Sequence, residues 1–193
     1  MRILYLHGLA SSKESNTVKV LKEHLQEDTI LSIDIPMEPY DALKEIFKTI
    51  TTFHPHLIIG NSLGGFYAQF FEGPLKILIN PALKPDEEIT KVLGGYGEFP
   101  YLKDRVEKTF TYNSSDETSF AILRENFELT IKDIDHVRQT YAIFGMYDTV
   151  VNDREYFRKH YLNKHALTFN GEHRLTDDNI IHILIPLINE IRQ

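Results

Sequence analysis

The 193-residue sequence contains no cysteine, so the chain can form no disulfide, build no thiolate metal site and use no cysteine nucleophile. It also lacks any apolar run near the roughly 20 residues that a membrane-spanning helix needs. The N-terminal sequence MRILYLHG enters a strand pattern directly, without the apolar region and cleavage site of a signal peptide. These absences predict a cytoplasmic protein.

Positive charge is also scarce. The 21 Lys and Arg residues are outnumbered by 28 Asp and Glu residues, which gives a net charge of −7 at pH 7. Nucleic acids and acidic membranes both attract a basic face, so this balance argues against either partner. The apolar and charged fractions, 42% and 25%, are ordinary for a globular protein. No repeat or linker divides the chain, and its length suits a single domain over residues 1–193.

Short apolar runs alternate with segments of helical periodicity along most of the chain. Strands alternating with helices favour a parallel sheet with right-handed crossovers and helices on both faces. The sequence therefore predicts an α/β fold with six parallel strands. A capping-box spacing at Ser11 and Glu14 predicts the start of the first helix. Pro186 predicts a kink in the last helix, which begins near Thr176. The strands are expected at residues 3–6, 29–35, 57–59, 76–79, 140–144 and 166–169.

The alternation breaks between about residues 81 and 136. Pro85 opens a short helix that Gly94 closes, and Ser114 with Glu117 caps a second one. An aromatic-rich stretch between these helices shows no regular pattern. A connection between a helix and a strand usually spans about 2–6 residues, so some fifty residues are too many. We predict a short helical cap inserted after the fourth strand.

The most specific motif lies in residues 56–71, HLIIGNSLGGFYAQFF. An apolar strand runs into a turn of the form G-x-S-x-G, and a helical pattern follows. Ser62 must be strained at the tip of this turn, and Gly60 and Gly64 let the strand and helix backbones approach closely. The alternative is a glycine-rich turn with an idle serine, since turns of small residues are common.

Four polar residues each follow the end of a different predicted strand: His7, Ser62, Asp148 and His173. Because ligands in parallel sheets bind beyond the carboxyl ends of the strands, we expect these four at one edge. A serine hydroxyl becomes a nucleophile when an imidazole takes its proton and a carboxylate orients that imidazole. The chain order Ser62, Asp148, His173 is that of α/β-hydrolases. Asp153 is the alternative to Asp148 as the acid.

The segments YLHGL, GNSLGG, NPA, FGMYD and NGEH resemble the α/β-hydrolase serine esterases, specifically the small bacterial YqiA-like family. The resemblance covers residues 5–173 and implies a serine-esterase mechanism. It assigns Ser62 as nucleophile, His173 as general base and Asp148 as the orienting acid. The resemblance also implies an oxyanion hole made by the backbone N–H groups of Leu63 and Leu9. Its supporting residues are His7, which organises the loop, and the glycines Gly8, Gly60 and Gly64.

Two positions depart from the family pattern. Leu9 stands where relatives often carry an aromatic residue, a change that a backbone donor tolerates. Arg174 directly follows the predicted base, where a small apolar residue is more usual; it either attracts acidic substrates or faces solvent. Asn80, after the fourth strand, is expected to cap that strand.

These observations predict a serine hydrolase acting on carboxylic esters or thioesters of short-chain acyl groups, with a small-molecule substrate. An acyltransferase, or a hydrolase of another acyl bond, would use the same triad, and a non-catalytic binding module on the same fold is the third hypothesis. No cofactor and no metal is expected, since the pair His54 and His56 has no acidic partner at ligand spacing. The sequence leaves the oligomeric state open.

Overall fold

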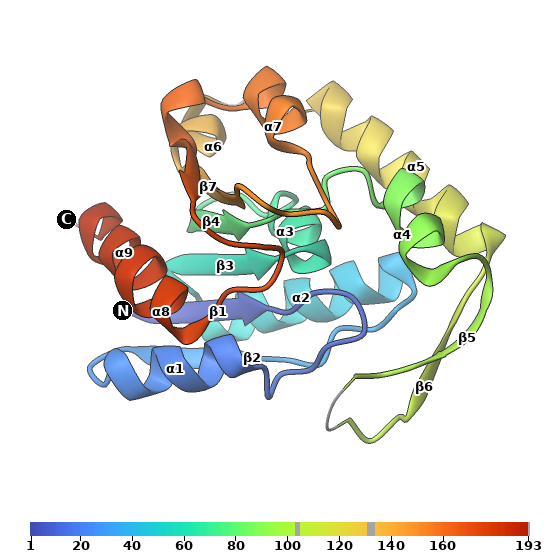
Figure 1. Cartoon of the computed structure of the whole chain (residues 1–193), viewed down its shortest axis with the longest axis horizontal. Helices are drawn as coiled ribbons and strands as arrows, with labels where there is room; N and C mark the ends of the chain where they lie inside the picture. Colours follow the sequence, from blue (N-terminus) through green and yellow to red (C-terminus); the bar gives the residue numbers. More distant parts are fainter. Residues whose placement is uncertain (103–104, 131–133, 193) are drawn as a thin grey trace.

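The computed structural model describes residues 1–102, 105–130 and 134–192 and contains a parallel six-stranded sheet, as predicted (Figure 1). The strand order is β2-β1-β3-β4-β7-β8, and every neighbouring pair is parallel. The second strand is shorter than expected and ends at Ser32. The strands are β1 (Arg2–Leu6), β2 (Thr29–Ser32), β3 (Leu57–Asn61), β4 (Leu75–Ile79), β7 (Thr140–Gly145) and β8 (Ala166–Phe169).

The sheet separates two hydrophobic cores, because side chains alternate between the faces of each strand. On one face Leu4 and Ile58 pack with the helices α2 (Pro39–Phe53), α3 (Leu63–Ala68) and α7 (Arg154–His160). On the other face Ile3 and Ile59 pack with α1 (Asn16–His24) and α9 (Ile185–Ile191). Both faces of every central strand are therefore buried, which explains why these strands are continuous apolar runs.

The first two helices, α1 and α2, differ in how their N-termini are capped. The predicted capping box is wrong, since α1 starts at Asn16 with Ser15 at its N-cap. The hydroxyl of Ser12 instead accepts a hydrogen bond from the backbone N–H of Glu14, which makes a local turn. Helix α2 is capped by Glu38, whose side chain accepts from the N–H of Asp41 at 2.7 Å.

The C-terminal helical segment is distorted before Pro186, as predicted. Thr176 caps α8 (Asp177–Asn179), a π-helical turn covers Ile180–Leu184, and α9 follows. The N–H of Ile185 donates to the carbonyl of Ile180, five residues back. This wider turn accommodates a proline ring that would clash with a carbonyl four residues back. None of the helices in the described parts of the chain is long and apolar enough to span a bilayer.

The segment between β4 and β7 forms the inserted cap, whose first helix and two strands lie on the side toward which the strand arrows point (Figure 1). The sequence suggested an irregular stretch between the two helices of the cap. The structure has an antiparallel hairpin there instead, in which Phe99 pairs with Phe110. Strand β5 has the sequence GEFP, and glycine and proline both weaken a strand pattern, so the hairpin escaped prediction. The cap comprises α4 (Pro85–Leu93), β5 (Gly97–Pro100), β6 (Thr109–Tyr112), α5 (Ser114–Thr130) and α6 (Ile134–Arg138).

Candidate active site

Ser62 occupies the turn between β3 and α3 in a strained conformation, with φ 52° and ψ −118°. A positive φ is uncommon for any residue other than glycine and persists only where surrounding contacts impose it. The Ser62 N–H donates to the carbonyl of Ile79 at 2.9 Å, and its carbonyl accepts from Gly65 and Ala82 at 2.8 and 3.1 Å. These bonds tie the turn to β4 and to the start of the cap, so the strain is maintained by the fold.

Close backbone contacts require glycine at two of the predicted positions, Gly60 and Gly64, and the third, Gly8, is tightly packed. A Cβ on Gly64 would lie 2.1 Å from the carbonyl oxygen of Leu6, and one on Gly60 would lie 2.4 Å from that of Gly64. A Cβ on Gly8 would lie 3.1 Å from the Cβ of Ser62. The elbow glycines therefore permit the strand, helix and first loop to meet around Ser62.

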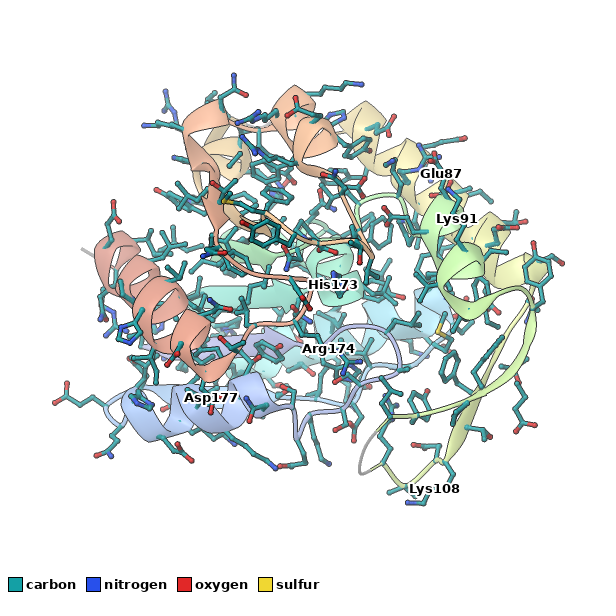
Figure 2. All side chains as sticks on the ribbon, viewed as in Figure 1. Glu87, Lys91, Lys108, His173, Arg174 and Asp177 are labelled. Atoms are coloured by element: carbon teal, nitrogen blue, oxygen red, sulfur yellow. The ribbon has the colours of Figure 1, made fainter. Side chains whose placement is uncertain are left out.

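The structure brings Ser62, His173 and Asp148 into one chain of hydrogen bonds. His173 Nδ1 lies 2.7 Å from Asp148 Oδ2, and His173 Nε2 lies 3.1 Å from Ser62 Oγ. The other carboxylate oxygen, Asp148 Oδ1, accepts from the backbone N–H groups of Val150 and Val151. A neutral imidazole with its proton on Nδ1 therefore donates to Asp148 and leaves Nε2 to accept from the serine hydroxyl. His173 lies in the loop between β8 and α8 (Figure 2).

His7 holds the first loop rather than a reacting group. Its Nδ1 donates to the carbonyl of Gly8 at 2.8 Å, and its Nε2 accepts from the N–H of Ile35 at 3.0 Å. Burial, with a smaller contribution from the charge of Arg105, lowers the pKa of His7 to about 4, although the hydrogen bond to Gly8 and the charge of Asp34 act in the opposite direction. A neutral ring with both nitrogens bonded to backbone is suited to fixing a loop.

The two predicted oxyanion donors come from the elbow and from the loop after β1. Leu63 is the first residue of α3, so its N–H has no acceptor within the helix. Leu9 follows β1, and the next residue, Ala10, has a φ of 57° that turns the loop. Leu9 and Leu63 both line a small cavity beside the elbow, so the two residues border the same space.

The side chain of Asn80 makes more hydrogen bonds than the strand cap expected from the sequence would need. It is 1% exposed, and its Nδ2 donates to the carbonyls of Glu172 and His173 at 3.0 and 2.9 Å. Its Oδ1 accepts from the N–H of Gly145 at 2.6 Å. Asn80 thus links the ends of β4 and β7 to the loop that carries His173. The sequence offered one signal, an Asn-Pro pair after a strand, since asparagine tolerates the left-handed φ of 41° found here.

Among the described residues, no hydrogen bond joins Asp153 to His173. Its Oδ2 accepts from the N–H groups of Leu83 and Lys84 at 2.7 and 3.2 Å, and its Oδ1 lies 3.1 Å from Lys84 Nζ. The side chain is 1% exposed, so Asp153 anchors the beginning of the cap to the end of the Asp148 loop. Arg174, next to His173 in Figure 2, is exposed.

The described residues contain no group of three or more His, Asp or Glu side chains that could hold a metal ion. The ring of His56, one of the two histidines considered in the sequence, accepts from the N–H of Arg2 at 2.9 Å. One of its two nitrogens therefore has a structural partner.

Solved structures with the same architecture define the class of protein. Alpha/beta hydrolase domain-containing protein 10 from mouse matches with a TM-score of 0.67 and 17% identity, over 98% of this chain and 88% of the mouse chain. The esterase domain of a Rhodothermus marinus protein matches with a TM-score of 0.63 and 19% identity, over 99% and 85% of the two chains. The fold is therefore that of the α/β-hydrolases.

Within this class, residues 2–177 match the family described as "Uncharacterised protein family (UPF0227)", and the chain belongs to that family. A UPF0227 protein of Vibrio atlanticus (strain LGP32) is 24% identical over 173 residues, which are 84% of this chain and 94% of the relative. The α/β-hydrolase fold and the family expected from the sequence motifs are confirmed.

Proposed function

We propose that this protein is a serine hydrolase that cleaves carboxylic esters or thioesters of short-chain acyl groups through an acyl-enzyme. The proposal depends on one observation above all, the hydrogen-bond chain from Asp148 through His173 to Ser62, at 2.7 and 3.1 Å. Both distances lie in the range that a nucleophile and its general base require.

In the first step Ser62 Oγ attacks the carbonyl carbon while His173 Nε2 takes the hydroxyl proton. Asp148 stabilises the imidazolium that forms. The carbonyl oxygen becomes an oxyanion that accepts from the N–H groups of Leu63 and Leu9, and each such donor is worth roughly 2.7–4 kcal/mol. The tetrahedral intermediate then expels the alcohol or thiol, which takes the proton from His173.

In the second step water replaces the leaving group. His173 removes a proton from the water as its oxygen attacks the acyl carbon, and it returns that proton to Ser62 Oγ when the acid departs. The narrow space beside Leu9 and Leu63, about 10 Å³, supports a preference for small acyl groups. No step requires a metal or an organic cofactor.

The proposal is tested by labelling the purified protein with a fluorophosphonate and locating the adduct by mass spectrometry. We expect one adduct on Ser62 in the wild type and none in Ser62→Ala, whose turnover of short esters should fall by roughly 10⁴-fold or more. Circular dichroism and the melting temperature should stay near wild type, because the missing Oγ packs little. Near wild-type turnover by Ser62→Ala would refute the serine mechanism. A wild type that neither labels nor hydrolyses any ester would favour the binding-module hypothesis.

A further inference from the structure

The small cavity beside the elbow has walls from three parts of the chain: the loop after β1, the start of α3, and the residues that follow β5. Its volume is about 10 Å³, close to what one water molecule occupies. The N–H of Leu102 donates to the carbonyl of Ala10 at 2.7 Å and holds the hairpin against the first loop. Prominent residues of the walls are Leu9, Met37, Leu63, Tyr67, Tyr101 and Arg105.

Arg105 brings a buried positive charge to this cavity. The residue is 8% exposed, and its guanidinium carbon lies 4.0 Å from the centre of the Tyr101 ring. Its Nη1 donates to the carbonyls of Ile35 and Ser11 at 3.1 and 3.4 Å. Its Nε has no hydrogen-bond partner among the described residues, and its ion pair with the mostly exposed Glu107 spans 3.9 Å. A buried guanidinium normally has a close anionic partner, and among the described residues no carboxylate pairs with this one more closely than Glu107.

Tyr67 supplies a second unsatisfied donor on the same walls. Its side chain is fully buried, and its hydroxyl has no hydrogen-bond partner in the described parts of the chain. Burial raises the pKa of Tyr67 well above its ordinary value, so the hydroxyl keeps its proton and can donate. Leaving buried donors unpaired is costly, and two of them belong to residues that border one cavity.

We infer that this cavity is a subsite for a carboxylate of the substrate, so that the preferred esters carry a carboxylate a few atoms from the scissile carbonyl. The inference rests on the proposed function, because Leu9 and Leu63 join the cavity to the predicted oxyanion hole. A guanidinium matches a carboxylate in charge and planar geometry, and the attraction strengthens away from water. The small volume leaves room for the carboxylate alone, so the short chain that carries it would lie outside the cavity.

The test compares two substrates of equal length, monoethyl glutarate and the ethyl ester of its monoamide. The wild type should hydrolyse the carboxylate substrate with a kcat/KM roughly 10-fold or more above that of the amide. Arg105→Gln should reduce this ratio by roughly 10- to 100-fold, and Arg105→Lys should retain part of it. Arg174→Gln is the matched control, because it removes one exposed positive charge next to His173 and should change the ratio little.

Equal kcat/KM on the two substrates by the wild type would overturn the subsite, as would an Arg105→Gln variant that loses both activities equally. If Arg105→Gln does not fold, competitive inhibition of the wild type by glutarate but not by glutaramide decides the question. Failure of the proposed function looks different, since the wild type would then neither label with the fluorophosphonate nor hydrolyse the amide ester. In that case calorimetric binding of glutarate, with its loss in Arg105→Gln and partial retention in Arg105→Lys, still tests the cavity.

Discussion

Asp148 and Asp153 lie five residues apart, yet their carboxylates hold different parts of the molecule. Asp148 lies against His173 Nδ1, whereas Asp153 accepts from the first N–H groups of the cap. Backbone geometry explains the difference. Asp148 sits in the turn directly after β7, while Asp153 occupies the N-cap position of α7 and its side chain makes no cap bond there.

This division of roles predicts opposite effects of two equal substitutions. Asp148→Asn keeps an oxygen for the N–H groups of Val150 and Val151 but presents an amide to His173, which supports the wrong tautomer. We expect turnover to fall by about 10⁴-fold with little change in stability. Asp153→Asn should instead cost about 1–3 kcal/mol of unfolding free energy and leave most of the turnover. Steady-state kinetics measure the turnover of each variant, and urea unfolding measures its stability. A large loss of turnover in Asp153→Asn but not in Asp148→Asn would contradict the assignment of the acid.

At the scale of elements, the ends of β4 and β7 and the His173 loop meet at Asn80. Asn80→Ala removes three hydrogen bonds at once and should displace His173 from Ser62 Oγ. A displacement of about 1 Å can lower a rate by roughly 10²-fold, so kcat should fall far more than KM rises. The NMR chemical shifts of the His173 ring should also change.

Asn113→Ala is the control for Asn80→Ala. The Asn113 side chain accepts from the N–H groups of Ser115 and Asp116 at the start of α5, so its loss should cost about 1 kcal/mol of stability. It should leave kcat and the NMR chemical shifts of the His173 ring unchanged. If Asn80→Ala showed only the same loss of stability, Asn80 would have no positioning role.

A residue at the end of the cap hairpin leads us to predict a preference for short acyl chains. Tyr101 follows β5 and lines the cavity beside Leu9 and Leu63. Wild-type activity on p-nitrophenyl esters should therefore decline as the acyl chain lengthens from acetate. Tyr101→Ala should open the space and move the preference toward longer chains. Tyr96 is a half-exposed tyrosine of the cap whose hydroxyl donates to Glu117. Tyr96→Ala should therefore leave the dependence of activity on acyl-chain length unchanged.

The opposite outcome has a structural meaning as well. A preference for emulsified long-chain triglycerides over short esters would contradict the small acyl pocket. It would imply a cap that opens to expose a larger apolar surface.

At the scale of the whole molecule, His7 couples the stability of the fold to pH. The unfolded ring has a pKa near 6.5, while the buried ring has a pKa of about 4. Between these values the unfolded chain binds a proton that the folded chain does not, so stability falls as the pH drops through this window. The loss amounts to about 3 kcal/mol from pH 6.5 to 4, and the contribution is fully present above pH 6.5.

Urea unfolding at several pH values tests this coupling. In His7→Gln the ring is gone, so the difference in unfolding free energy between wild type and variant should shrink as the pH falls from 6.5 to 4. Subtracting the variant removes the contributions of all other titrating groups. A difference that is constant across this range would show that His7 does not hold a neutral ring in the folded protein.

Much of the fold was predictable because its causes are local. A short apolar run bounded by turn residues favours a buried strand, and G-x-S-x-G between such a run and a helical pattern favours a close turn. The strand pattern also predicted which loops meet, since parallel strands end at one edge of the sheet. Ser62, Asp148 and His173 were therefore predictable as a set before their distances were known.

The sequence by itself thus determined the strands, the elbow and the edge at which the candidate site forms. Only the tertiary structure decided that Asn80 reaches Glu172, 92 residues away, that Asp153 holds Leu83 rather than His173, and that Arg105 borders the cavity by the elbow. The two sets of features differ in their physical origin. Backbone sterics and hydrophobic periodicity act over a few neighbouring residues, whereas the partner of a buried polar group depends on how distant segments pack.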